Sequence, residues 1–195
     1  MTEEAVCFSP SDFVQHEVKV RRMKKRGPWI PSKLVVVYSL RSLRYLQRLT
    51  HSRFAQCWYS LQRPLHIGKY RKTSVSLLCN WIGASAACMM LEEVIALGAR
   101  EIVEVGVAGG IQPSLKPGDI IVVTSAERDE GTSSHYLPAD AELECSDTMR
   151  RRIESYFSEQ GIKYHKGPVW TTDAPYQETR EKFHRFRKEG VLGVN

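Results

Sequence analysis

The chain has 195 residues, of which 42% are hydrophobic and 26% charged, so it can form a folded core of ordinary size. Its net charge of +6 suits an anionic small substrate, since positive charge attracts anions. No zinc-finger or RNA-binding aromatic motif accompanies this charge, so nucleic-acid binding is not favoured. No apolar run is long enough to span a bilayer, and the five cysteines contain no CxxC pair, so neither a disulfide framework nor a metal site is predicted.

The first 31 residues are polar and basic, with a cationic run over residues 19–26. We expect them to form a basic N-terminal arm ahead of a single domain over residues 32–195. Within the arm, the residues Ser9-Pro10-Ser11-Asp12-Phe13 are typical of a turn that leads into a short helix.

Strand and helix patterns alternate along the rest of the chain. The predicted strands are 33–38, 66–70, 74–79, 101–105, 119–125 and 165–171. The predicted helices are 40–49, where leucine recurs every third residue, then 82–97, 149–160 and 177–188. This alternation predicts an α/β domain with a mixed sheet.

The segment 103–112 places a glycine turn between two β-rich runs. Glycine has no Cβ, so a small ligand can lie directly against the main chain of such a turn. The backbone N–H groups of Val107, Ala108 and Gly109 are therefore candidates for ligand contact. The alternative is a tight junction between two elements, in which the glycines serve packing alone.

Six segments, in order, resemble the nucleoside phosphorylase family that includes the uridine phosphorylases and the hexameric purine nucleoside phosphorylases. They are 82–93, 97–110, 118–120, 126–136, 171–176 and 190–192. The forms of 129–136 and 171–176 are most similar to a uridine-phosphorylase-like branch. The resemblance implies a three-layer α/β fold in which helices flank a central mixed sheet, and it predicts that the last elements of this fold lie beyond Asn195.

By this resemblance, the chain is expected to be a pentosyltransferase of nucleoside metabolism and nucleotide salvage. It would cleave the N-glycosidic bond of a nucleoside, with a uridine-like nucleoside as the preferred substrate, and use phosphate to give free base and ribose 1-phosphate. The resemblance implies phosphate as co-substrate without an organic cofactor, a cytoplasmic homo-oligomer, and no nucleic-acid or membrane partner. Two alternatives stay open: a nucleosidase that uses water on the same fold, and a catalytically inactive nucleoside-binding homologue.

The expected phosphate-binding residues come from two places in the chain. The family's Gly-Asp-Pro turn and the arginine that follows it correspond to 38–44, where a bidentate guanidinium is available. With the glycine turn, the predicted set is Arg41, Arg44, Val107, Ala108 and Gly109. The alternative for the arginines is a solvent-exposed helix face. Glu104 stands where the family has a second arginine, and Val107 replaces its phosphate-binding Thr or Ser; both departures favour the nucleosidase.

The expected base and substrate side is a second set, in which threonine hydroxyls and an aromatic face suit a base ring. It consists of Gly106, Arg128, Thr171, Thr172, Asp173 and Tyr176. Asp173 has an alternative role as the cap of a helix that begins near Pro175. The family's ribose-binding glutamate falls beyond Asn195, so no catalytic residue is assigned, and we expect the chain to be a C-terminally truncated form with weak or no activity alone.

Overall fold

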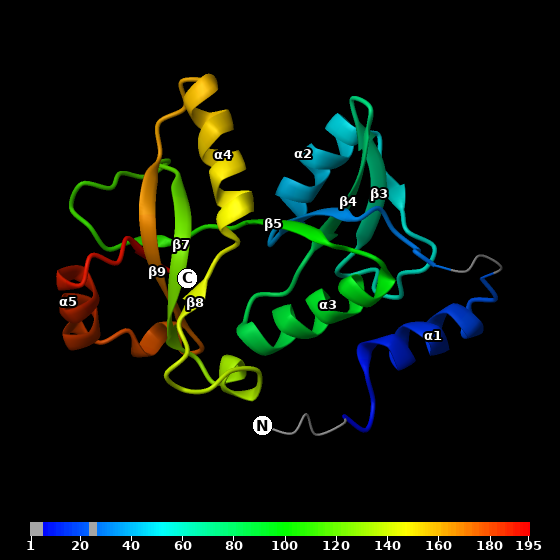
Figure 1. The fold of residues 1–195 in the computed structure, drawn as a ribbon, viewed down its shortest axis with the longest axis horizontal. Coiled ribbons are helices and arrows are strands. Elements are labelled where there is room, and N and C mark those ends of the chain that lie inside the picture. The colour runs from blue at the N-terminus through cyan, green and yellow to red at the C-terminus, as the bar shows by residue number, and fades with distance from the viewer. Residues whose placement is uncertain (1–5, 24–26) are drawn as a thin grey trace. The chain divides into compact units, whose positions relative to one another are not determined.

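A computed structural model describes residues 6–23 and 27–195 of the chain. The fold divides into two compact units, residues 1–106 and 107–195 (Figure 1). Each unit has its own five-stranded sheet. The predicted α/β class is confirmed, with the strands divided over two sheets. Residues 1–5 and 24–26 of the predicted arm lie outside the described residues.

The sheet of the first unit has the strand order β2-β3-β4-β1-β5. Its strands are β1 (Lys33–Val37), β2 (Arg53–Phe54), β3 (Leu65–Tyr70), β4 (Thr73–Cys79) and β5 (Glu101–Val105). Strand β1 lies between β4 and β5 and is parallel to both, whereas β3 is antiparallel to both β4 and β2. The strands predicted in this part are confirmed.

Alternating side chains of β1 build the layers of the first unit, because successive residues of a strand point to opposite faces. Leu34 and Val36 belong to a buried cluster with helix α3 (Ala84–Leu97), whereas Val37 belongs to a second cluster with helix α2 (Leu40–Thr50). The sheet is therefore covered by α2 on one face and α3 on the other (Figure 1), which is the three-layer arrangement that the family resemblance implies.

Helix α1 (Pro10–Val20) packs outside α3, and its Val14 is buried in the same cluster as Leu34. A capping box starts the helix, because the Ser9 side chain accepts from the backbone N–H of Asp12 while the Asp12 carboxylate accepts from that of Ser9. Residues 10–20 of the predicted basic arm are therefore helical and packed; the boundary between residues 31 and 32 stays a prediction.

The sheet of the second unit has the strand order β6-β10-β9-β7-β8. Its strands are β6 (Gly109–Gly110), β7 (Ile121–Asp129), β8 (Leu143–Glu144), β9 (His165–Thr172) and β10 (Gly193–Val194). Strands β7 and β10 both run parallel to β9, whereas β6 and β8 are antiparallel edge strands. The sequence predicts β7 and β9 but none of the two-residue strands.

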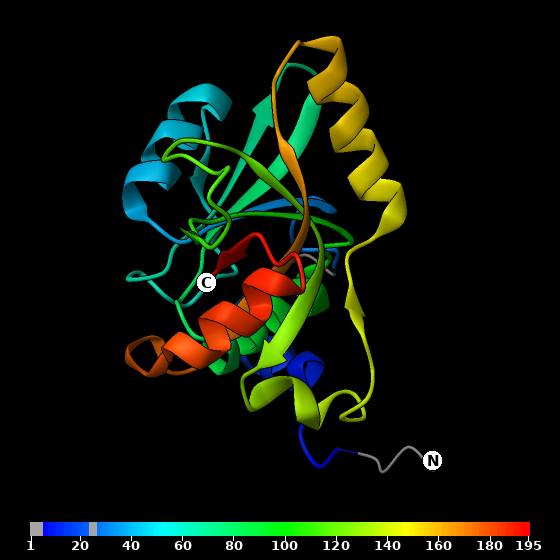
Figure 2. The same ribbon diagram turned by 90° about the vertical axis from the view of Figure 1, so that its left-hand side faces the viewer.

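The predicted helix 177–188 is two separate pieces in the structure. A short 3-10 turn, η2 (Pro175–Gln177), is followed by α5 (Arg180–Lys188), whose first turn is capped by the Thr179 side chain. Figure 2 shows both pieces, from orange to red, before the chain returns to the sheet as β10. Phe186 of α5 packs on Trp170 of β9 with ring centroids 4.7 Å apart, and this contact forms the centre of the second unit's core.

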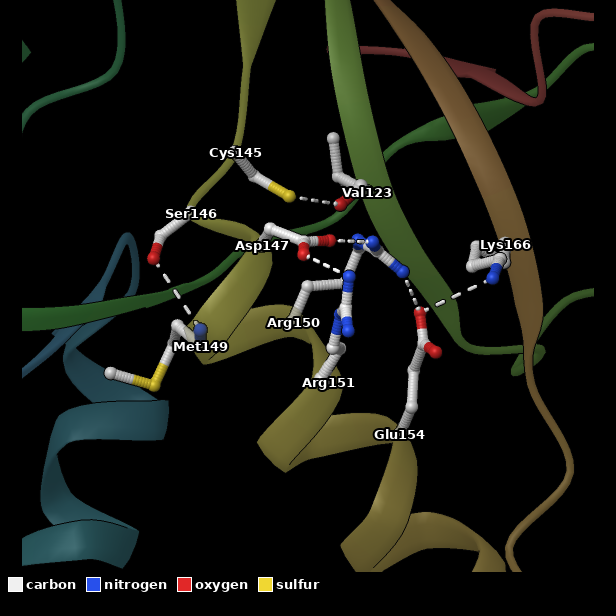
Figure 3. A network of polar contacts seen from close by, with 9 residues as sticks. All are labelled: Val123, Cys145, Ser146, Asp147, Met149, Arg150, Arg151, Glu154 and Lys166. Atoms are coloured by element: carbon white, nitrogen blue, oxygen red, sulfur yellow. Dashed lines mark hydrogen bonds and ion pairs between the residues drawn. The ribbon is translucent and has the colours of Figure 1, made fainter.

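Helix α4 (Asp147–Glu159) has no fully buried residue, and a network of charged side chains on it reaches β9 through Glu154 (Figure 3). Arg150 lies between Asp147 and Glu154, and its guanidinium is 2.6 Å from the Glu154 carboxylate. That carboxylate also lies 3.5 Å from the ammonium of Lys166 on β9. Because these charges are partly exposed, we assign them to positioning α4 against the sheet rather than to strong stabilisation.

Candidate active site

The carboxyl ends of the parallel strands β7, β9 and β10 lie side by side in the second unit. Asp129 at the end of β7 pairs in register with Thr172 at the end of β9. Asn195 follows β10, and its backbone carbonyl accepts from the Thr172 N–H at 3.2 Å. In α/β sheets, ligands bind outside the carboxyl ends of the strands, so we call this the carboxyl edge and treat it as the candidate site.

The glycine turn reaches this same carboxyl edge. Strand β6 is antiparallel to β10 and pairs Gly109 with Val194, so the residues before Gly109 lie where β10 ends. A Cβ on Gly193 would lie 3.2 Å from both the Ala108 Cβ and the Gly109 carbonyl oxygen. The glycine at 193 thus permits the close approach of β6, which is a packing role; ligand contact by Val107, Ala108 and Gly109 stays a prediction.

The structure brings most of the predicted substrate residues of the second unit together at the carboxyl edge. Arg128 pairs in register with Thr171, one step before the pair formed by Asp129 and Thr172. Asp173 follows directly, whereas Tyr176 lies in η2 with 98% of its surface exposed. The side chain of Val107 is also 94% exposed, so it is open to a ligand but offers no hydrogen bond.

Arg128 is engaged by the loop that follows β7. Its Nε donates to the Ser133 hydroxyl at 2.7 Å, and its two terminal nitrogens donate to the carbonyl oxygens of Pro138 (2.6 Å), Ala141 (3.1 Å) and Leu137 (3.3 Å). Because a guanidinium has five N–H groups, four of them are used within the loop. Arg128 therefore holds the loop 133–141 against the carboxyl edge; its predicted contact with a base is not tested.

Asp173 does not cap the helix that follows it, so that alternative is wrong. Its carboxylate accepts a hydrogen bond from the Gly131 N–H at 2.8 Å, and η2 has no side-chain cap. The hydroxyl of Thr172 instead accepts from the Ala174 N–H at 3.3 Å. Asp173 thus ties the end of β9 to the turn after β7, at the mouth of the same edge.

Asp129 is a residue of the carboxyl edge that the sequence does not single out. Its carboxylate accepts from the Lys182 ammonium at 2.7 and 2.8 Å and from the Trp170 indole N–H at 3.1 Å. Partial burial works against ionisation, but the hydrogen bonds from Lys182 and Trp170 prevail and hold the pKa of Asp129 below its usual value. Because the predicted strand ends at residue 125, four residues before Asp129, the sequence pattern does not place this carboxylate at a strand end.

Arg41 and Arg44 lie in the first unit, on the exposed side of α2. Together with Tyr45 and Arg48 they line a shallow hollow of about 330 Å³. The structure thus places both predicted phosphate ligands next to a third arginine that the sequence did not single out. Their contact with phosphate stays a prediction.

Glu104 and Tyr38 form a pair at the carboxyl ends of β5 and β1. The Tyr38 hydroxyl donates to the Glu104 carboxylate at 2.8 Å. Burial, followed by the nearby Glu104 charge, raises the pKa of Tyr38 far above its ordinary value, so the phenol keeps its proton. Gly106 lies beside this pair: a Cβ there would meet the Tyr38 ring at 3.5 Å, an ordinary contact.

Within residues 6–23 and 27–195, no group of three or more His, Cys, Asp or Glu side chains is arranged to hold a metal ion. None of the helices in the described part of the chain combines the length and the apolar character needed to cross a membrane.

Comparison with known proteins gives one consistent family. The model of the phosphorylase superfamily matches residues 41–195. The uridine phosphorylase of Thermococcus kodakarensis is 36% identical over 115 residues, which cover 57% of this chain and 40% of that protein. A DeoD-type purine nucleoside phosphorylase of Exiguobacterium sibiricum is 28% identical over 128 residues, which cover 65% of this chain and 53% of that protein.

The same fold is found among solved structures. The uridine phosphorylase of Vibrio fischeri ES114 superposes with a TM-score of 0.79 at 24% identity, over 85% of this chain and 70% of that chain. This likeness shows the fold. The chain spans about half the length of the curated relatives it matches.

Proposed function

Because the chain belongs to the phosphorylase superfamily, we propose that it acts in the phosphorolysis of a nucleoside, with a uridine-like nucleoside as the preferred substrate. In this pentosyl transfer, the bond between C1′ and the base nitrogen breaks and its electron pair leaves with the base. A phosphate oxygen forms the new bond to C1′, which gives ribose 1-phosphate. The similarity to a uridine phosphorylase at 36% identity supports this choice of substrate.

The observation that carries the proposal is the gathering of polar groups at the carboxyl edge. Thr171, Thr172 and Asp173 end β9, the turn of Val107 to Gly109 approaches from β6, and the loop held by Arg128 closes the far side. Threonine hydroxyls and turn N–H groups can bind the polar edges of a base and sugar, and donors fixed before the reaction stabilise the charge that develops on the leaving base.

The proposed roles follow the two sets of residues. We assign phosphate binding to Arg41, Arg44 and the backbone of residues 107–109. We assign substrate binding to Gly106, Arg128, Thr171, Thr172, Asp173 and Tyr176. The other parts of the proposal come from the family resemblance: phosphate as co-substrate with no organic cofactor, assembly as a homo-oligomer, and work in cytoplasmic nucleotide salvage.

A second candidate function, hydrolysis of the nucleoside by water, is favoured by the contact between Tyr38 and Glu104. The Tyr38 phenol donates a hydrogen bond to the Glu104 carboxylate, which holds that carboxylate in place at the end of β5. A carboxylate repels phosphate, and it is also the group that takes a proton from an attacking water. Phosphate dependence separates the two functions.

The test is incubation of the chain with uridine, inosine and adenosine, with and without phosphate, followed by measurement of free base and ribose 1-phosphate. Release of base only with phosphate supports phosphorolysis, and release without phosphate supports hydrolysis. No release from a protein with a folded circular dichroism spectrum refutes both for this chain.

Thr171→Val then tests the site itself. Loss of one hydroxyl at the carboxyl edge is expected to raise the KM for the nucleoside about 10-fold, which corresponds to roughly 1.4 kcal/mol. Ser155→Ala on α4, which removes a hydroxyl bonded to Glu159, is the matched control and should leave KM unchanged.

A further inference from the structure

The exposed side of α2 carries a row of arginines without acidic neighbours on the helix. Arg41, Arg44 and Arg48 fall within about 60° of one another around the axis and span about 10 Å along it. We call these three residues, with Tyr45, the arginine stripe. The helix contains no Asp or Glu, and none of the three guanidinium groups has an ion pair with any residue that the structure describes.

A row of guanidinium groups without acidic partners is unfavourable, because like charges on consecutive turns of a helix repel one another. An anion that contacts all three relieves this repulsion. Phosphate is the matching chemistry, since the planar fork of arginine donates two parallel hydrogen bonds to phosphate oxygens. The hollow that the stripe lines, at about 330 Å³, is large enough for a small phosphorylated molecule rather than a duplex.

Tyr45 extends the chemistry of the stripe beyond inorganic phosphate. Tyr45 is 63% exposed and lines the hollow together with the three arginines. An exposed aromatic face beside cationic groups is a platform on which a nucleobase stacks. Phosphate on the arginines and a base on Tyr45 are the two halves of one nucleotide.

We propose that the arginine stripe of α2 binds a nucleoside phosphate, with its phosphate on Arg41, Arg44 and Arg48 and its base on the ring of Tyr45. The binding itself is independent of turnover. One consequence rests on the proposed function: since Arg41 and Arg44 are the assigned phosphate ligands, a nucleotide on the stripe competes with the co-substrate and slows phosphorolysis most at low phosphate.

Calorimetric titration of the 195-residue chain with uridine 5′-monophosphate, inorganic phosphate and uridine tests the proposal. We expect the nucleotide to bind about 10-fold more tightly than phosphate, because stacking of the base on Tyr45 adds to its affinity. Arg48→Ala should weaken both anions about 10-fold, whereas Tyr45→Ala should weaken the nucleotide alone. Arg48→Lys should recover only part of the loss, because an ammonium lacks the bidentate fork.

Two controls make the result decisive. Lys19→Ala removes one exposed positive charge from α1 and should leave nucleotide binding unchanged, since it lies on a different helix. Excess uridine should not displace the nucleotide from the stripe. Equal binding of nucleotide and phosphate, equal losses in Lys19→Ala and Arg48→Ala, or displacement by uridine overturns the proposal. Nucleotide binding without any release of base would refute the proposed function while leaving this proposal intact.

Discussion

The contact between Asp129 and Lys182 predicts a measurable coupling between β7 and α5. The Lys182 ammonium lies within 2.8 Å of both carboxylate oxygens, while the Trp170 indole holds one of them from below at 3.1 Å. The two charged side chains are 25% and 37% exposed, so solvent screens part of their attraction. We therefore expect a coupling free energy of about 1 kcal/mol, at the upper end for exposed pairs and below that of buried charged hydrogen bonds.

A double-mutant cycle with Asp129→Asn and Lys182→Met, followed by urea unfolding, measures this coupling. The control is a second cycle at Lys33 and Glu101, whose charged atoms lie 3.9 Å apart and whose side chains are 52% and 38% exposed. That pair should couple by less than about 0.3 kcal/mol. Equal coupling in the two cycles would refute the reasoning that hydrogen-bond geometry and partial burial set the strength.

The pH dependence of the same coupling has a fixed sign. Because the pKa of Asp129 is lowered in the folded state, the interaction is fully present above the unfolded value of about 3.9 and is lost as the pH falls through the folded value. The coupling should therefore be constant from pH 5 to 8 and disappear in stronger acid. A coupling that rises in acid would contradict the assignment of a charged carboxylate.

Three further predictions concern other parts of the chain. Arg128→Lys keeps the positive charge but loses the planar guanidinium that donates to several loop carbonyls. Amide hydrogen exchange at residues 136 and 137 should therefore become about 10-fold faster, which corresponds to a decrease of roughly 1.4 kcal/mol in the free energy of local opening, while exchange in β9 stays unchanged. Burial raises the pKa of Glu93, so the protein should lose stability as the pH rises above about 4.3, and Glu93→Gln should remove that decline in thermal unfolding between pH 4 and 7. Gly68→Ala would put a Cβ 2.6 Å from the Thr50 carbonyl oxygen, so urea unfolding should show a loss of about 2 kcal/mol, against less than about 1 kcal/mol for Gly106→Ala; equal losses would contradict the clash.

The regular elements of the fold could be predicted because each carries its own local pattern. In α2, where leucine recurs every third residue, Leu43 is buried and Leu46 partly buried against the sheet, whereas Leu40 and Leu49 are 44% exposed. The continuous β-branched run of β1 indicates a strand buried on both faces, and Val36 and Val37 belong to different core clusters. Strands β2, β6, β8 and β10 have two residues each, too few to show a period of two. They exist because a neighbouring strand offers free backbone groups, which a local pattern does not reveal.

The sequence indicates which residues gather at the carboxyl edge but not which contacts they make, and their role in binding stays a prediction. Thr171, Thr172 and Asp173 were found because they end a strand and match a family segment, and the carboxyl edge brings them together. The partner of Asp129 is 53 residues away in sequence and that of Tyr38 is 66 residues away, so no local signal connects them. The same distance effect hid the true role of Asp173, whose partner is Gly131 rather than the helix after it.

The first unit carries two groups with opposite effects on phosphate: a carboxylate that repels it and arginines that attract it. The Glu104 carboxylate, which accepts a hydrogen bond from Tyr38, lies at the end of β5 and disfavours an anion at that position. Helix α2, which begins directly after Tyr38 and Ser39, carries three arginines on its exposed side that form no ion pair with any described residue. We therefore expect the arginine stripe to attract phosphate to this unit. It follows that Arg48→Ala should weaken phosphate binding whether or not base is released. Glu104→Gln should strengthen phosphate binding by removing the opposing charge. If neither variant changes phosphate binding in calorimetry, phosphate does not bind the first unit, and hydrolysis becomes the better account of the reaction.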